Sequence, residues 1–118
     1  MSRSVQSNAW RSRIYDILEA IETIAQFTAV MTLADFSADP RTTHAVFYNF
    51  IVIGEAVRHV PPEIADRYPH LPWHRMRAMR NVMVHQYLHV VLEVVWQTLR
   101  DDLPPLVPHL REILEREP

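Results

Sequence analysis

Apolar side chains in this chain recur at steps of three and four residues, and this spacing restricts the fold more than any other feature. The clearest stripe is made by Trp10, Ile14, Ile17, Leu18, Ile21, Ile24 and Ala25. A stripe of this kind covers one face of an amphipathic helix. The chain has a single glycine, and its β-branched residues do not alternate with polar ones as they do in strands. We therefore expect an all-α fold.

Proline residues and polar segments divide the chain into four to five expected helices. The expected elements are a helix over 8–30, a connector over 31–43, a helix from about 40 to 60, one helical turn within 63–68, a helix from 71 or 72 to about 85, a helix from about 90 to Pro104, and a closing helix after Pro105. Proline cannot donate a backbone hydrogen bond, so it marks these boundaries. The sum predicts a helical bundle.

Individual positions add detail to this outline. Ser37 and Asp39 are candidate N-caps, and Pro40 suits a first helical position. Gly54 inside a helix costs about 1 kcal/mol against alanine, which indicates a close approach of two helices. Glu55, beside it, is able to reach an arginine of the third long helix. We also expect Phe27 and Val30 to pack in the core, and we interpret Met76, Met79 and Met83 as core or dimer seam.

Length and composition limit the class of protein. At 118 residues we expect one domain over 1–118, with loose termini at 1–8 and 116–118, and an oligomer would help a chain of this size. The absence of cysteine removes disulfides and thiolate metal sites. The chain has neither a signal peptide nor 18 uninterrupted apolar residues, which predicts no membrane association and a cytoplasmic location.

The charge distribution is more informative than its sum. The net charge of −2 argues against a general nucleic-acid coat protein. Residues 56–92 nevertheless hold five arginines against two acidic residues, a balance of +3, and every basic residue of the chain is arginine. Arginine makes bidentate contacts to phosphate. The basic part of the chain is therefore a candidate phosphate-binding region.

Most of the reactive side chains lie within residues 72–91. They are Arg75, Arg77, Arg80, Asn81, His85 and Tyr87, with no acidic residue among them. On one helix, Arg80 and Tyr87 share a face and Asn81 and His85 share the neighbouring face, whereas Arg80 and His85 do not meet. They converge only if the helix ends near His85 or if a symmetry-related chain supplies one of them.

An arginine and a histidine are sufficient for one kind of phosphate chemistry. Histidine exchanges protons near neutral pH, and arginine stabilises negative charge that develops on a phosphate. Together they support metal-free RNA cleavage by the ribose 2′-hydroxyl. The Arg-x4-His spacing by itself is a weak signal, and a structural histidine is the commoner explanation of it.

The segment from Arg80 to Tyr87 resembles the Arg-x4-His-x-Tyr signature of HepT-like proteins, a branch of the HEPN superfamily of small helical ribonucleases and nucleotide-associated domains. The resemblance covers about residues 10–115. It includes Ile14–Ile21, Ala38–Arg41, Asn49, Ile53–Ala56, Pro61–Pro62, Pro72–Trp73, Met79–Asn81 and Asp101–Pro105.

The resemblance implies the toxin of a prokaryotic type VII-like toxin–antitoxin pair. It implies a symmetric homodimer whose motifs face one another in a cleft, an RNA substrate, and a minimal nucleotidyltransferase antitoxin that adds AMP to Tyr87. Arg80 would hold the phosphate, His85 would transfer protons and Asn81 would support them. We add Arg75 and Arg77 as candidate RNA contacts.

The sequence departs from the family pattern directly after the histidine. Gln86 stands where relatives often have an acidic residue, and Leu88-His89 replaces a common Phe-Gly. Because glycine alone takes positive φ freely, we expect a changed loop after Tyr87. This departure affects loop shape and antitoxin recognition and leaves Arg80 and His85 in place.

Two other interpretations remain open. His85 and His89 have the i, i+4 spacing of a zinc pair, but no third ligand is evident and His44, His59, His70, His74 and His109 look scattered. We therefore predict no metal and no cofactor. The second alternative is a non-catalytic helical module that binds a nucleotidyltransferase, and loss of RNA cleavage on His85→Ala would distinguish an enzyme from it.

Overall fold

The computed structural model describes the backbone of residues 2–118 and the side chains of residues 9–118, and the expectation of a loose terminus at 1–8 lies outside the described side chains. All regular secondary structure in the described chain is helical and no strand is present, which confirms the all-α fold. The long helices are α1 (Ser2–Thr28), α3 (Pro40–Val57), α5 (Trp73–Gln86) and α7 (Leu106–Arg116). The short elements are α2 (Leu33–Ser37), α4 (Pro62–Ala65), a 3₁₀ turn (Tyr87–His89), α6 (Leu92–Gln97) and a π-helical turn (Thr98–Asp102).

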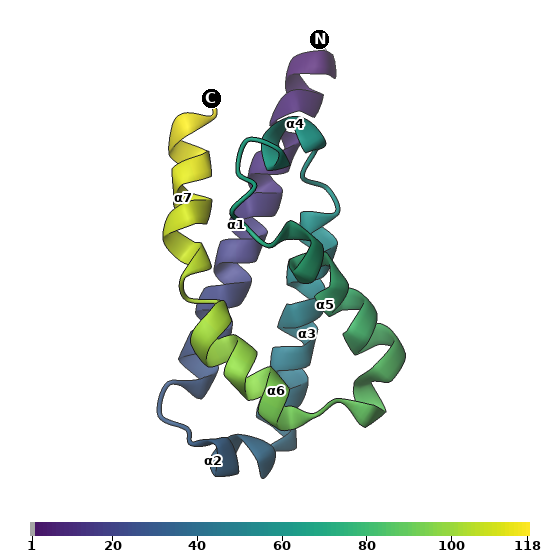
Figure 1. The fold of residues 1–118 in the computed structure, drawn as a ribbon, viewed down its shortest axis with the longest axis vertical. Coiled ribbons are helices and arrows are strands. Elements are labelled where there is room, and N and C mark those ends of the chain that lie inside the picture. Colours follow the sequence, from purple (N-terminus) through teal and green to yellow (C-terminus); the bar gives the residue numbers. More distant parts are fainter. Residues whose placement is uncertain (1) are drawn as a thin grey trace.

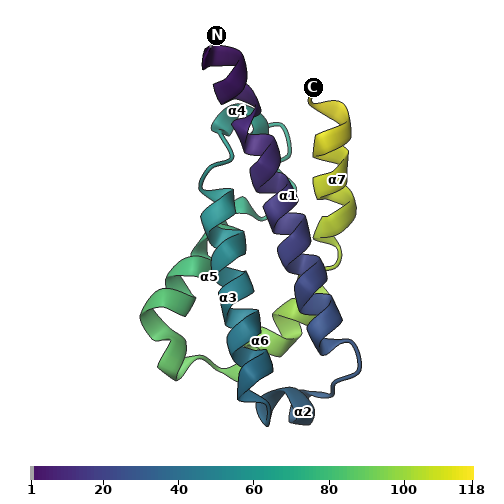
Figure 2. The same cartoon turned by 180° about the vertical axis from the view of Figure 1, so that it is seen from behind.

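The four long helices form an elongated bundle of 50 × 27 × 22 Å. Helix α3 lies in the middle, with α1 on one side and α5 on the other, and α7 packs along α1 (Figure 1). The view from behind shows the same order and places α2 and α6 at the end of the bundle opposite the N-terminus (Figure 2). This arrangement leaves one side of α5 open to solvent.

The core is built from the helical stripes that the spacing predicts, except that Ala25, the last member of the first stripe, is exposed. Its fully buried side chains include Ile14, Ile17 and Ile24 of α1, Val46, Ile53 and Val57 of α3, Met76 of α5, and Leu110 and Ile113 of α7. The prediction for Phe27 and Val30 is wrong, because their side chains are 48% and 95% exposed. Phe27 lies in the last turn of α1 and Val30 in the turn that follows it, and Thr28 between them is 1% exposed, so the two apolar side chains face away from the buried side of the chain.

Asp39 caps α3, as its position before Pro40 predicts. Its carboxylate accepts hydrogen bonds from the backbone N–H of Thr42 at 3.2 Å and from the Thr42 hydroxyl at 2.8 Å. These bonds lower the pKa of Asp39. The prediction that Ser37 is an N-cap is wrong, since Ser37 is the last residue of α2.

The C-terminal residues are tied to the loop between α4 and α5. The sequence predicts that 116–118 are loose, whereas the structure shows the Glu117 carboxylate accepting hydrogen bonds from the Tyr68 hydroxyl at 2.9 Å and from Arg67. Burial raises the pKa of Tyr68, and the bond to Glu117 raises it further. The end of α7 therefore holds the loop that leads into α5.

None of the helices in the described part of the chain is both long enough and apolar enough to cross a membrane.

Candidate functional site

Gly54 allows α3 and α5 to touch at Arg80. A Cβ atom built on Gly54 would lie 2.5 Å from the Arg80 Cβ and 2.8 Å from the Arg80 backbone nitrogen. Ordinary contacts between carbon atoms are about 3.5–4.0 Å. The close helix approach predicted at Gly54 is therefore confirmed, and it fixes the backbone of Arg80 against α3.

Glu55 holds the guanidinium group of Arg80 from the neighbouring helix. Its Oε1 lies 3.7 Å from the Arg80 Nε, and the same carboxylate accepts hydrogen bonds from Arg58 Nη1 at 2.9 and 3.1 Å. The bond from Arg58 is the largest cause of a lowered pKa at Glu55, and the charge of Arg80 contributes. The expected reach of Glu55 to an arginine of the third long helix is confirmed.

Asn81 provides the second contact to Arg80. The Arg80 Nη1 donates a hydrogen bond to the Asn81 Oδ1 at 3.3 Å, so Asn81 lies beside the arginine that it is expected to support. Within residues 9–118 no contact engages the Arg80 Nη2. Since a guanidinium group carries five N–H donors, Arg80 retains donors that are free to meet an anion.

His85 lies on the same helix as Arg80 but on a different face. Helix α5 runs without interruption to Gln86, so five residues separate the two side chains by about 140° around the helix axis. Although α5 ends one residue after His85, the helix is regular up to that point, so its end does not bring Arg80 and His85 together within the described chain. His85 is exposed, and a second copy of the chain is the remaining route.

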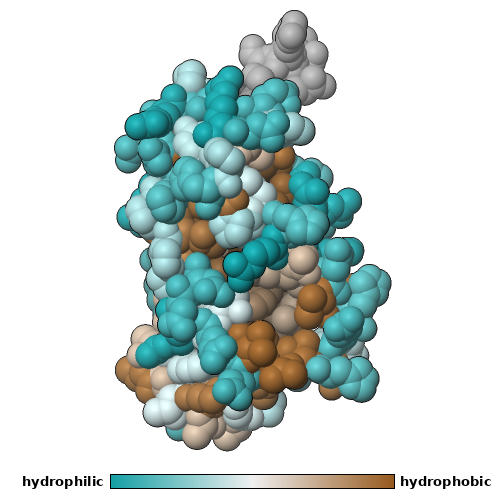
Figure 3. Space-filling view, viewed as in Figure 1, coloured by the Kyte–Doolittle hydropathy of each residue, from teal (hydrophilic) through white to brown (hydrophobic). Residues whose placement is uncertain are grey.

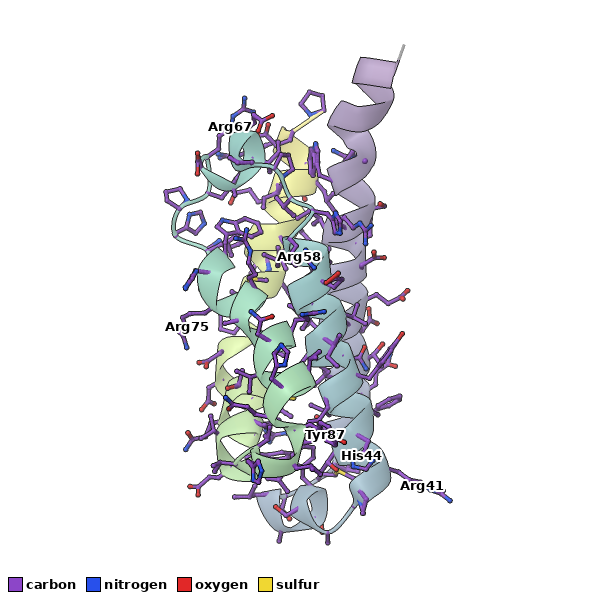
Figure 4. The ribbon with its side chains drawn as sticks, turned by 90° about the vertical axis from the view of Figure 1, so that its right-hand side faces the viewer. Arg41, His44, Arg58, Arg67, Arg75 and Tyr87 are labelled. Atoms are coloured by element: carbon purple, nitrogen blue, oxygen red, sulfur yellow. The ribbon has the colours of Figure 1, made fainter. Side chains whose placement is uncertain are left out.

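Tyr87 opens the 3₁₀ turn that follows α5 and is 56% exposed. Its ring lines a groove of about 400 Å³ between α3 and α5, which it shares with His44 and Tyr48 of α3. Figure 4 shows Tyr87 and His44 near one another at one end of these two helices. No sequence pattern indicated His44 or Tyr48 at this position, because both come from a helix some 40 residues earlier.

The turn after Tyr87 forms without a left-handed residue. Leu88 and His89 complete the 3₁₀ turn, and no residue of the described backbone has positive φ. A glycine at this point is therefore unnecessary for the observed turn. Leu88, which stands where the family commonly has phenylalanine, is 76% exposed beside Tyr87.

Arg75 and Arg77, the two candidate RNA contacts, lie on different surfaces of the structure. Arg75 is 76% exposed, lies 3.7 Å from Asp102 through Nη2, and points outward from α5 (Figure 4). Arg77 lines a groove with Arg58 and His59 at the end of α3. Arg77 thus shares a basic surface with the Glu55–Arg58 pair, whereas Arg75 is partnered elsewhere.

The described residues bring one set of three possible metal ligands together. The set consists of His70, His109 and Glu112, so the interpretation of the histidines as scattered is wrong for the first two. They are 39 residues apart in sequence, and only the packing of α7 brings them into contact. His85 and His89, the pair that the spacing suggests, are not part of this set.

Comparison with known proteins finds similarity to ribonucleases of one family. A family model described as ribonuclease HepT-like matches residues 17–113. A protein of Methanocaldococcus jannaschii named "Putative RNase MJ0127" is 34% identical over 89% of this chain and 87% of its own length. A protein of Thermococcus cleftensis named "Probable ribonuclease HepT" is 38% identical over 77% of this chain and 83% of its own. No solved structure matches the chain significantly.

Proposed function

The chain belongs to the ribonuclease HepT-like family, and from this premise we propose that it is an endoribonuclease toxin that cleaves RNA without a metal ion. The proposal rests on two observations together: the chain matches a ribonuclease family, and its fold holds Arg80 in place. Gly54 fixes the Arg80 backbone and Glu55 and Asn81 hold its guanidinium group. An exposed imidazole and an exposed phenol follow on the same segment.

The proposed reaction uses only these side chains and the RNA. The ribose 2′-oxygen attacks the adjacent phosphorus, and the bond from phosphorus to the 5′-oxygen of the next nucleotide breaks. One imidazole accepts the 2′-hydroxyl proton, and a protonated imidazole gives a proton to the leaving 5′-oxygen. Arg80 binds the phosphate oxygens as charge accumulates on them. The products end in a 2′,3′-cyclic phosphate and a 5′-hydroxyl.

A homodimer supplies what one chain lacks. Because Arg80 and His85 point to different sides of α5 in the described chain, we propose that each site combines Arg80 of one protomer with His85 of its partner. Each site then needs one His85, which accepts the 2′-hydroxyl proton and gives it to the leaving 5′-oxygen.

A complementation experiment tests this arrangement. Arg80→Ala and His85→Ala are purified separately, unfolded together and refolded as a mixture. A mixed dimer with shared sites contains one intact site, so activity returns to about a quarter of wild type, given random pairing and two sites per wild-type dimer. If each protomer uses its own pair, every mixed dimer is inactive and the proposal of shared sites is wrong.

We further propose that a minimal nucleotidyltransferase antitoxin silences the site at Tyr87. The phenolic oxygen attacks the α-phosphorus of ATP, pyrophosphate leaves, and the phenolic proton passes to solvent. Two features support this role: the phenol is more than half exposed, and the groove with His44 and Tyr48 offers rings on which an adenine can stack.

The matched variant for this step is Tyr87→Phe, which keeps the ring and removes the acceptor oxygen. With the antitoxin and ATP, wild type is expected to gain the mass of AMP and lose cleavage, and Tyr87→Phe to do neither. AMP found on Tyr87→Phe would place the acceptor elsewhere. Tyr48→Phe, in the same groove, is the control that should still be modified.

One observation favours the second candidate function, a non-catalytic binding module. Helices α5 and α6 enclose an apolar groove of about 450 Å³, and Val91 and Val94 on its edge are 60% and 57% exposed. Figure 3 shows apolar residues gathered on the surface in the region of α6. Exposed apolar patches mark interaction surfaces. If unmodified protein cleaves no RNA while Val94→Asp abolishes partner binding, the binding module is the better description.

A further inference from the structure

Two histidines and a glutamate meet at the opposite end of α5 from His85. The His70 Nε2 lies 3.3 Å from the His109 Nδ1, and the possible ligand atoms of His70, His109 and Glu112 all lie within 4.8 Å of one another. His70 belongs to the loop between α4 and α5, and the other two belong to α7. The proposed ribonuclease chemistry uses none of these side chains.

The backbone around this cluster is fixed by contacts that do not depend on a ligand. Tyr68 and Leu71, which flank His70, are 5% and 3% exposed. Tyr68 also donates to Glu117 at 2.9 Å, and its carbonyl accepts a hydrogen bond from the Trp73 indole at 3.0 Å. A ligand at the cluster would therefore meet side chains on two segments that are already held together.

We propose that His70, His109 and Glu112 bind a zinc-class transition-metal ion that clamps the loop before α5 to α7. Zinc bonds to imidazole nitrogen are about 2.0–2.1 Å long, which puts two ligands of a tetrahedral ion about 3.3–3.4 Å apart. The separation of the two imidazole nitrogens matches that value. Imidazole and carboxylate are both zinc ligands, and three protein ligands leave one position for water.

Only weak contacts compete with the ion. The Glu112 Oε2 lies 3.3 Å from the Arg116 Nε, and the arginine side chain is 70% exposed. Exposed i, i+4 pairs contribute only about 0.3–0.5 kcal/mol. The two imidazole rings meet edge to face, with ring centroids 4.6 Å apart, and the contact between their nitrogens is replaced when both bind the ion.

The role of the ion is structural. Along α5, His85 lies about 18 Å from the start of the helix at a rise of 1.5 Å per residue, so the ion stands far from the cleavage chemistry. It would stabilise the entry into α5 from the loop. Chelation would then lower thermal stability and leave the cleavage step itself intact in folded protein.

The test has two measurements on the metal-free protein. Titration calorimetry measures zinc binding, and thermal unfolding with and without ZnCl₂ measures its effect on Tm. We expect one ion per chain and, at about 100 times Kd, a rise in Tm of roughly 10 °C. Co²⁺ in place of zinc should give the visible absorption of a four-coordinate ion. His70→Gln, His109→Gln and Glu112→Gln should each lower affinity at least about tenfold, because even the loss of an outer hydrogen-bonding partner costs that much.

His74→Gln is the matched control, since His74 is an exposed histidine four residues from His70 and lies outside the cluster. Far-UV circular dichroism in chelator establishes that each variant folds. The proposal is overturned if wild type binds no zinc, or if any of the three ligand variants binds zinc as tightly as His74→Gln does. Loss of binding in His74→Gln or in His85→Gln, with binding kept in the cluster variants, would place the ion elsewhere.

Discussion

The contact between Gly54 and Arg80 makes Gly54→Ala the most informative single substitution. It adds one methyl group at the point where α3 and α5 touch. The new Cβ would lie 2.5 Å from the Arg80 Cβ and 2.8 Å from its backbone nitrogen. Because the second contact is to backbone, a change of rotamer cannot relieve it, and the helices must separate.

Two opposing effects determine how much Gly54→Ala changes the free energy of unfolding. Restoring ordinary contact distances of about 3.5–4.0 Å moves the helices apart by about 1 Å, and overpacking of this kind costs about 1–3 kcal/mol. Alanine returns about 1 kcal/mol of helix propensity. Because the contact involves backbone, the overpacking cost lies in the upper part of its range, about 2–3 kcal/mol. Subtracting the gain in helix propensity leaves a net loss of unfolding free energy of about 1–2 kcal/mol. For a chain of this size Tm falls by roughly 4–8 °C.

The displacement also reaches the proposed catalytic arginine. A shift of about 1 Å in a catalytic group lowers rates up to about a hundredfold, so RNA cleavage should fall ten- to a hundredfold at temperatures where the variant is folded. Ala25→Gly, at an exposed position of α1, measures the propensity effect alone. If Gly54→Ala raises Tm by as much as Ala25→Gly lowers it, the helices do not resist the methyl group and the reasoning is refuted.

Three further predictions follow from other contacts. Because hydrogen bonding by Arg58 lowers the pKa of Glu55 below its ordinary 4.5, Glu55 stabilises the folded state above that pH and loses this effect as pH falls through its folded pKa. The Tm difference between wild type and Glu55→Gln should therefore narrow as pH falls from neutral to below 4.5, and a constant difference would contradict this. Leu110→Ala, at a fully buried position, should lower the urea-derived unfolding free energy by about 2–5 kcal/mol, and a loss below 1 kcal/mol would contradict the packing of α7. Cleavage should weaken steeply with added salt. Arg77→Ala should reduce that salt dependence, whereas Arg75→Ala should not, because Arg75 lies outside the groove of Arg58 and Arg77 and beside the Asp102 carboxylate.

The helices were predictable where one pattern controlled the backbone. The stripe of α1 and the Asp39-Pro40 start of α3 are local signals, and the structure contains both. Helix α2 was missed because it has only five residues, although Thr32 and Asp35 form a capping box there. The π-helical turn at Thr98–Asp102 was missed as well, since it has the same apolar spacing as the helix it follows.

The site was predictable as a segment but not as a three-dimensional arrangement. Residues 80–87 stand out by composition, and Glu55 is expected to reach an arginine of the third long helix, but only the structure identifies that arginine as Arg80. The neighbours of Tyr87 and the meeting of His70 with His109 depend on packing between distant segments. No local pattern reports such contacts, and sequence alone could not supply them.

The central claim is that unmodified protein cleaves RNA through His85, and cleavage in chelator by partner-free protein tests it most directly. Intact mass first establishes that Tyr87 carries no AMP, and His85→Ala is compared with His89→Ala, a neighbouring exposed histidine on the 3₁₀ turn. We predict products ending in 2′,3′-cyclic phosphate or its 3′-phosphate, lost in His85→Ala and kept in His89→Ala. Absence of cleavage by unmodified protein on varied RNAs, or cleavage that requires a divalent ion, would contradict the claim.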